Sequence, residues 1–253
     1  MALPTSPFLS IAVLGFEIAV VLVILAGLLL IRSRLERSDL AARRVVTLTA
    51  GVLAAWFLVA VWLARAGVFR AVVDGPIPPM IAYGITLPIL IGLAVVLSSR
   101  AFGRVLAAVP QHWLVGVQFY RTLGVIFLVL HASGRLPGVF AIPAGYGDVL
   151  VGVAAVIVAV LYAKKGLQAR RAVVGWNVLG IVDLLVAVTL GFLSSPGRFQ
   201  ILSLGAPNEA ISAYPLVMIP VFAVPLSILL HACSLTKLSR EARLGHPPAR
   251  SWR

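Results

Sequence analysis

Long apolar stretches alternate with short polar connections along the whole chain, and seven of them approach the length needed to cross a bilayer. A helix needs about 20 predominantly apolar residues for this, because it rises ~1.5 Å per residue through a hydrocarbon core ~30 Å thick. The pattern predicts an all-α fold, a polytopic membrane helix bundle of seven transmembrane helices in a single domain over residues 1–253. The predicted spans cover residues 8–31, 45–64, 79–98, 111–132, 148–163, 172–194 and 214–235.

Basic residues gather in every second connection between these spans. Segments 32–44, 99–110, 164–171 and 236–253 hold 16 of the 21 lysines and arginines, whereas the connections on the other side hold four. Connections rich in Lys and Arg stay in the cytoplasm. We therefore expect a multi-pass protein of a prokaryotic cytoplasmic (plasma) membrane. Its N-terminus would lie outside and its C-terminus inside, with 236–253 as a basic cytoplasmic tail.

The composition favours the lipid bilayer as the main partner of the chain. Hydrophobic residues make up 61% of it and charged residues 11%, whereas about a quarter of a soluble domain is charged. The net charge of +13 lies in short clusters between apolar runs, so we do not expect nucleic-acid binding. The chain has no HExxH or GxSxG motif and no lysine inside a predicted span. These absences argue against a metalloprotease, a serine hydrolase and a retinal protein, so an enzyme is not favoured.

Three charged side chains interrupt the apolar spans at one common depth. Arg121 and Asp183 lie about 10 and 11 residues from the inner ends of their spans, and Glu17 about 9 residues from the outer end of the first. These separations correspond to roughly 13–16 Å along a helix. Gln118 lies one turn from Arg121 on the same face. A charge at the bilayer centre costs at least ~2.5 kcal/mol, so such residues are usually paired and often functional.

Two interpretations of this midplane cluster remain open. Arg121 and Asp183 could form a structural ion pair between the fourth and sixth spans, in a membrane protein that transports nothing and serves structure or assembly. Alternatively, two acids and one arginine leave one negative charge over, which could hold a proton, a small cation or an amine. The second interpretation favours a small-solute or proton-coupled carrier, or a ligand-binding membrane protein, with Glu17, Arg121, Asp183 and Gln118 at its site.

The connection before the fifth span is apolar and punctuated by glycine and proline. Residues 139–142 carry no charge, so we expect Leu136–Tyr146 to pack back onto the bundle, in the interface or over a cavity, instead of lying in solvent. Whether the 133–147 loop is re-entrant stays open. Asp148 follows Gly147 where the fifth helix is predicted to begin, which favours an N-cap role. With His131 and Tyr146 nearby, Asp148 would line an outer mouth.

Two histidines lie within about a turn of the predicted cytoplasmic boundary, His112 on the fourth span and His231 on the seventh. Such a pair could be the axial ligands of a b-type haem, which makes a haem-binding redox protein a weaker alternative. They could equally be interfacial residues with one end in water. No other cofactor is predicted. Asn177, with Gly175 and Gly180 nearby, is interpreted as a site of close helix packing.

The C-terminal two-thirds of the chain carries a series of short motifs. They are Tyr120-Arg121 with Gly124, residues 134–137 through Gly147-Asp148, Asn177, Gly180, Asp183-Leu184-Leu185, Pro220, Pro225-Leu226 and His231 to Leu235. In these motifs the chain resembles a family of uncharacterised bacterial seven-helix integral membrane proteins. The resemblance implies a membrane location and about seven helices, and it implies no activity.

Overall fold

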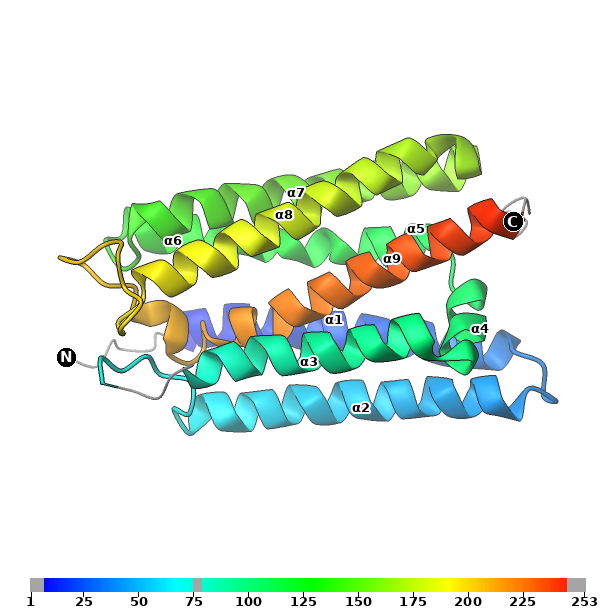
Figure 1. The fold of residues 1–253 in the computed structure, drawn as a ribbon, viewed down its shortest axis with the longest axis horizontal. Coiled ribbons are helices and arrows are strands. Elements are labelled where there is room, and N and C mark those ends of the chain that lie inside the picture. Colours follow the sequence, from blue (N-terminus) through cyan, green and yellow to red (C-terminus); the bar gives the residue numbers. More distant parts are fainter. Residues whose placement is uncertain (1–6, 75–78, 245–253) are drawn as a thin grey trace.

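The computed structural model describes residues 7–74 and 79–244, which are helical apart from their connections and contain no strand. The long helices run along the long axis of the molecule, and the short α4 lies across it (Figure 1). The α-helices are α1 (Pro7–Arg34), α2 (Leu40–Arg65), α3 (Met80–Ser98), α4 (Arg100–Ala108), α5 (Gln111–Gly116), α6 (Val125–Ala132), α7 (Gly138–Lys165), α8 (Arg170–Ser194) and α9 (Val224–Leu244). Three 3₁₀ segments, η1 (Val117–Gly124), η2 (Gly166–Ala169) and η3 (Ala210–Ser212), and one π-helix, η4 (Ile219–Ala223), interrupt or join them. The predicted all-α class is confirmed.

Within the described residues, six helical stretches are long and apolar enough to cross a membrane. They cover residues 8–34, 40–65, 80–98, 111–132, 138–194 and 219–242. The fifth stretch, of 57 residues, contains both α7 and α8, which turn back on each other at η2 and lie side by side (Figure 1). The chain is thus an all-helical protein of the membrane type.

The outward faces of the helices are apolar. Leu22, Leu58, Leu90 and Ile157 belong to four different helices, and each is more than half exposed. Contact between water and so much apolar surface is unfavourable. On soluble proteins the exposed apolar area is scattered or confined to small patches. Lipid is the solvent that suits it.

One end of the bundle is rich in basic residues, and we call it the basic end. It comprises the connections 35–39 and 99–110, the turn η2 and the last turns of α9, whereas α1 begins at the opposite end (Figure 1). At the basic end, Asp39 accepts a 2.9 Å hydrogen bond from the Ala42 N–H and pairs with Arg104 at 3.1 Å. The Ala42 N–H first, and Arg104 second, hold the pKa of the Asp39 carboxyl below its usual range. This N-cap fixes where α2 starts.

The segment before residue 148 packs onto the bundle as predicted, but it is helical, so the expectation of a loop there is wrong. Helix α7 begins at Gly138, ten residues before the predicted start of the fifth span. Phe140 and Ala144 are buried, so the segment does pack against the bundle, but as the first turns of the helix. Pro143 removes one backbone donor from these turns, which membrane helices tolerate when neighbouring helices shield the freed carbonyl.

Helix α9 continues past the predicted end of the seventh span at residue 235 and ends at Leu244. Side chains near its end hold it against neighbouring elements. Lys237 pairs with Glu241 at 2.9 Å and donates a 2.9 Å hydrogen bond to the Ala107 carbonyl. Glu241 also accepts a 2.9 Å hydrogen bond from the Tyr162 hydroxyl. The predicted tail therefore begins as helix, and its residues 245–253 lie outside the described part of the chain.

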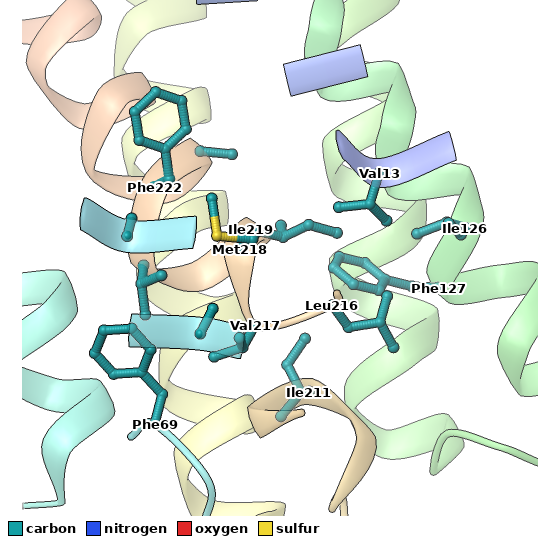
Figure 2. Close-up of a cluster of buried hydrophobic side chains, with 14 of the residues drawn as sticks. Val13, Phe69, Ile126, Phe127, Ile211, Leu216, Val217, Met218, Ile219 and Phe222 are labelled. Carbon is teal, nitrogen blue, oxygen red and sulfur yellow. The ribbon is translucent and has the colours of Figure 1, made fainter. Parts of the chain in front are cut away.

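The largest hydrophobic cluster surrounds η4, where the chain enters α9. All five residues of η4 are buried. Figure 2 shows Met218, Ile219 and Phe222 packed among side chains that include Val13 of α1 and Phe127 of α6. The Phe222 ring also contacts α2, with its centroid 4.6 Å from that of Trp56. This cluster joins α9 to both the α1–α2 side and the α6–α7 side of the bundle.

Candidate functional site

A run of 3₁₀ helix in the middle of the fourth span sets the orientation of its polar residues. Segment η1 has eight residues, which is long for this geometry. A 3₁₀ helix has three residues per turn, so Gln118, Arg121 and Gly124 stack on one face. All three are buried, whereas Phe119, on another face, is 48% exposed. The local helix type therefore aims Arg121 into the bundle.

Arg121 lies between two carboxylates, and we call Arg121, Asp148 and Asp183 the Arg121 cluster. Arg121 Nη2 is 2.8 Å from Asp148 Oδ1 and also pairs with Asp183 Oδ2. Arg121 Nε donates a hydrogen bond to Asp148 Oδ1 at 2.9 Å. Nη1 donates to the Gly180 carbonyl at 3.2 Å. The predicted ion pair between Arg121 and Asp183 is confirmed. Asp148 is its second acidic partner, inside α7, and the predicted N-cap role of Asp148 is wrong because α7 starts ten residues earlier.

Glycines let the helices approach closely around the cluster. A Cβ added to Gly147 would lie 1.7 Å from Asp183 Oδ1, and one added to Gly124 would lie 2.3 Å from the Asp148 Cβ. A Cβ on Gly180 would lie 2.4 Å from His231 Nε2. Small residues at helix interfaces are a common feature of membrane bundles. Here each one makes room for a charged or polar side chain.

A chain of buried polar side chains leads from Arg121 toward the basic end. His231 Nε2 lies 3.4 Å from Arg121 Nη1, and His231 Nδ1 lies 2.9 Å from Asn177 Oδ1. These contacts fit a neutral ring in which Nδ1 donates to Asn177 and Nε2 accepts from Arg121. Asn177 Nδ2 donates to Ser234 Oγ at 2.9 Å, and Gln111 Nε2 donates to the same oxygen at 2.7 Å. Asn177 is therefore a member of a polar network as well as a packing residue.

The position of His231 does not fit a haem ligand. Because α9 continues to Leu244, His231 lies 13 residues, about 20 Å, from the end of the helix instead of near its boundary. Both of its ring nitrogens have protein partners, so neither is free to ligate iron. His112 is partly buried, and its ring packs edge-on against Trp113 at 6.4 Å.

Glu17 and Gln118 are buried but lie outside the Arg121 cluster's hydrogen bonds. Glu17 is 2% exposed and Gln118 0% exposed. Within the described residues, no hydrogen-bond partner reaches any side-chain oxygen or nitrogen of either one. The structure thus brings together Arg121 and Asp183, adds Asp148, and leaves Glu17 apart. The hypothesis of one site formed by Glu17, Gln118, Arg121 and Asp183 has no hydrogen bond or ion pair of Glu17 or Gln118 to support it among the described residues.

The other two residues of the predicted outer mouth, His131 and Tyr146, lie in different surroundings from Asp148. His131 Nδ1 lies 3.0 Å from the Leu136 carbonyl, which closes the turn between α6 and α7. Tyr146 is 65% exposed on the outside of α7. No contact in the described residues links either side chain to Asp148.

A cavity of about 170 Å³ lies in the half of the bundle that is farther from the basic end. Its walls come from α3, α8 and η4, and they are almost entirely apolar. Asp148 lines it at the level of the Arg121 cluster, and residues 195–200 surround it where α8 ends. Asp148, one member of the cluster, therefore borders an open, apolar space.

The fold and this buried charged centre define an all-helical membrane-type protein with a polar site between its helices. Residues 78–239 match the family described as "Domain of unknown function (DUF8737)", and the chain belongs to that family. The matched region contains the whole Arg121 cluster and the cavity-lining residues of α3, α8 and η4, whereas Glu17 precedes it. No curated protein and no solved structure matches the chain.

Proposed function

We propose that the chain is a seven-span protein of a prokaryotic cytoplasmic membrane, with the basic end in the cytoplasm and the start of α1 outside. The turn at η2 supports the count, because it divides the 57-residue apolar stretch into two antiparallel helices. The clustering of Lys and Arg at one end supports the orientation.

A reporter fused after Arg253 tests this orientation. A fluorescent protein that folds in the cytoplasm should be bright at this position, and alkaline phosphatase, which needs the periplasm, should be inactive there. The same two reporters fused after Arg135, between α6 and α7, should give the opposite result and serve as the internal control. Phosphatase activity at Arg253 would overturn the arrangement.

For the function, we propose that the protein binds, and as a carrier moves, a small solute with an apolar body and a single cationic amine. The observation that carries this proposal is that Asp148 lines the apolar cavity while it shares Arg121 with Asp183. One guanidinium balances one of the two carboxylates, so the cluster has one negative charge in excess when both acids are ionised. A cationic group entering the cavity would meet that charge where little water competes.

The size of the cavity limits the body of the ligand. An apolar cavity of about 150 Å³ holds a benzene molecule, so a cavity of about 170 Å³ suits one ring or a short branched chain. The apolar walls keep the body of the ligand out of water, as lipid does, so an apolar ligand can move from the bilayer into the cavity without exposing its body to water. Benzylamine combines such a ring with a primary amine and is a suitable probe.

Benzylamine binding to the purified protein in nanodiscs is therefore expected to exceed that of benzyl alcohol, its neutral counterpart. A hydrogen bond to a charged group contributes about 1.5–3 kcal/mol, which corresponds to roughly 10- to 100-fold in affinity. Asp148→Asn leaves one arginine and one aspartate and should erase this preference without unfolding the protein. Titration calorimetry measures both ligands. Equal affinities in the wild type, or no binding of benzylamine, would contradict the proposal.

A structural role is the second candidate, and one observation favours it. All three nitrogens of the Arg121 side chain already have partners within the chain, so the cluster is complete without a ligand. In that case Asp148→Asn would affect stability alone, and neither probe would bind.

A further inference from the structure

Glu17 lies in a second polar site, separate from the Arg121 cluster. Its side chain borders a small cavity of about 10 Å³ between α1, η1 and the start of α9. Glu17 is 2% exposed, and neither carboxyl oxygen has a hydrogen-bond partner among the described residues. A buried carboxylate without a partner is costly, so this position favours either the neutral acid or an incoming cation.

The surroundings of Glu17 leave room for a proton and little more. A space of about 10 Å³ is at the lower limit for a single water molecule. Tyr120 is the other ionisable residue that lines the cavity, and its hydroxyl already contacts Ser227 Oγ at 2.6 Å and the Ala223 carbonyl at 3.2 Å. A metal ion would need several further oxygen ligands, which these walls do not supply.

No fixed charge on the neighbouring elements neutralises Glu17. Arg121 follows Tyr120 on η1, but its nitrogens are bonded on the side of α7, α8 and α9. Helix α2, which packs against α1, carries ionisable side chains near its two ends, at Arg43, Arg44 and Arg65. The carboxyl group of Glu17 is therefore free to exchange a proton without breaking an ion pair.

The π-helix η4 lies between the Glu17 cavity and the larger apolar cavity. Phe222 and Ala223 line the first, whereas Ile219, Pro220 and Val224 line the second. Prolines at 220 and 225 remove two backbone donors from this part of the chain, and π-helical turns often occur at functional sites. This short, buried segment therefore borders both cavities, and Figure 2 shows how tightly it is packed.

We propose that Glu17 is a proton-binding site that is linked through η4 to the ligand cavity. The arrangement seen here, with Glu17 buried and unpartnered and the cavity formed, is that of the neutral acid. Loss of the proton creates a charge that must reach water or a partner, and the movement of α1 against η4 alters the cavity. The link to ligand binding rests on the proposed function, whereas the proton site and its effect on η4 do not.

Two measurements on the full chain in nanodiscs test the proton site without a ligand. The infrared difference spectrum between wild type and Glu17→Gln should contain the carbonyl band of a protonated carboxylic acid at neutral pH. The wild type minus Glu36→Gln spectrum, for an exposed glutamate in the 35–39 connection, should not.

Amide hydrogen exchange over residues 217–226 is the second measurement. After correction for the intrinsic effect of pH, exchange should be equal in wild type and Glu17→Gln at low pH, where the wild-type acid is neutral. At high pH it should be faster in the wild type, because the amide side chain of the variant cannot ionise. Absence of the infrared band, or equal exchange at every pH, would overturn the proposal.

A third measurement tests the link to the ligand. Benzylamine stays cationic between about pH 5 and 8, as primary amines do. Its affinity for the wild type should fall as the pH rises through the titration of Glu17, by up to about tenfold per pH unit, and should change less in Glu17→Gln. Parallel pH profiles would refute the link. If benzylamine does not bind at all, the proposed function fails, and the infrared and exchange measurements still decide the proton site.

Discussion

Replacing Arg121 with methionine is expected to lower the free energy of unfolding by about 3–5 kcal/mol, the usual cost of leaving a buried charge without its partner. Asp148 and Asp183 would then face each other with no cation between them, and the Gly180 carbonyl would lose a donor. Since whole domains are stable by only about 5–15 kcal/mol, the loss should be evident as a lower melting temperature and a poorer yield. Thermal unfolding of the purified protein, followed by circular dichroism, measures it.

The matched control is Arg135→Met, which makes the same substitution at an exposed position between α6 and α7. It should leave the melting temperature nearly unchanged, because exposed arginines contribute little to stability.

Compensating variants separate charge balance from packing. Arg121→Met with Asp183→Asn should remain unstable, because Asp148 still lacks a cation. The triple variant Arg121→Met, Asp148→Asn, Asp183→Asn removes all three charges with little change in the volume of the acids, and should recover most of the stability. If the triple variant is as unstable as the single one, Arg121 stabilises the bundle through its contacts with Gly180 and His231 instead of through its charge.

The pairing of Arg121 with Asp183 could be predicted from the sequence because it depends on depth. Counting residues from the charged connections gives the level of each side chain in the membrane, and Arg121 is the one basic residue at the middle level. The same count does not give the rotation of each helix about its own axis, so it does not predict which neighbour a side chain faces. Glu17 lies beside Tyr120, the residue next to Arg121, but α1 turns it toward the small cavity that Tyr120 and Phe222 also line.

Asp148 is not predicted as a partner of Arg121 because the glycines and prolines before it indicate a loop. In lipid these residues are common within helices, since neighbouring helices shield the backbone. A signal is available in the spacing of the small residues around Asp148. Ala141, Ala144, Gly145, Asp148 and Gly152 stand at positions i, i+3, i+4, i+7 and i+11, which is the pattern of one face of a helix. All of these positions are buried in α7. Interpreted as a helix interface, the pattern places Asp148 inward.

The predicted depth of His231 is wrong for a related reason. Charged residues after position 235 indicate the end of a span, but Lys237 and Glu241 pair along the helix and contact α4 and α7 instead of solvent. With α9 two turns longer, His231 moves from the boundary to the middle of the bundle. Contacts between segments that are distant in the chain produce no periodic pattern in the sequence, so the sequence does not predict that the helix continues.

The last prediction compares two glycines on the same helix, Gly180 and Gly175 of α8. Gly180→Ala would place a Cβ 2.4 Å from His231 Nε2 and 3.0 Å from Arg121 Nη1, and both groups are held by hydrogen bonds and cannot easily move aside. Overpacking of this kind costs about 1–3 kcal/mol. At Gly175 no atom lies within 4 Å of the added Cβ, so alanine should be neutral or stabilise the helix by up to about 1 kcal/mol. Melting temperatures of the two variants measure the difference.

The difference in melting temperature should shrink when His231→Ala is added to Gly180→Ala, because the closest atom is then gone. Equal melting temperatures for Gly175→Ala and Gly180→Ala would mean that α8 does not pack against Arg121 and His231 in this way.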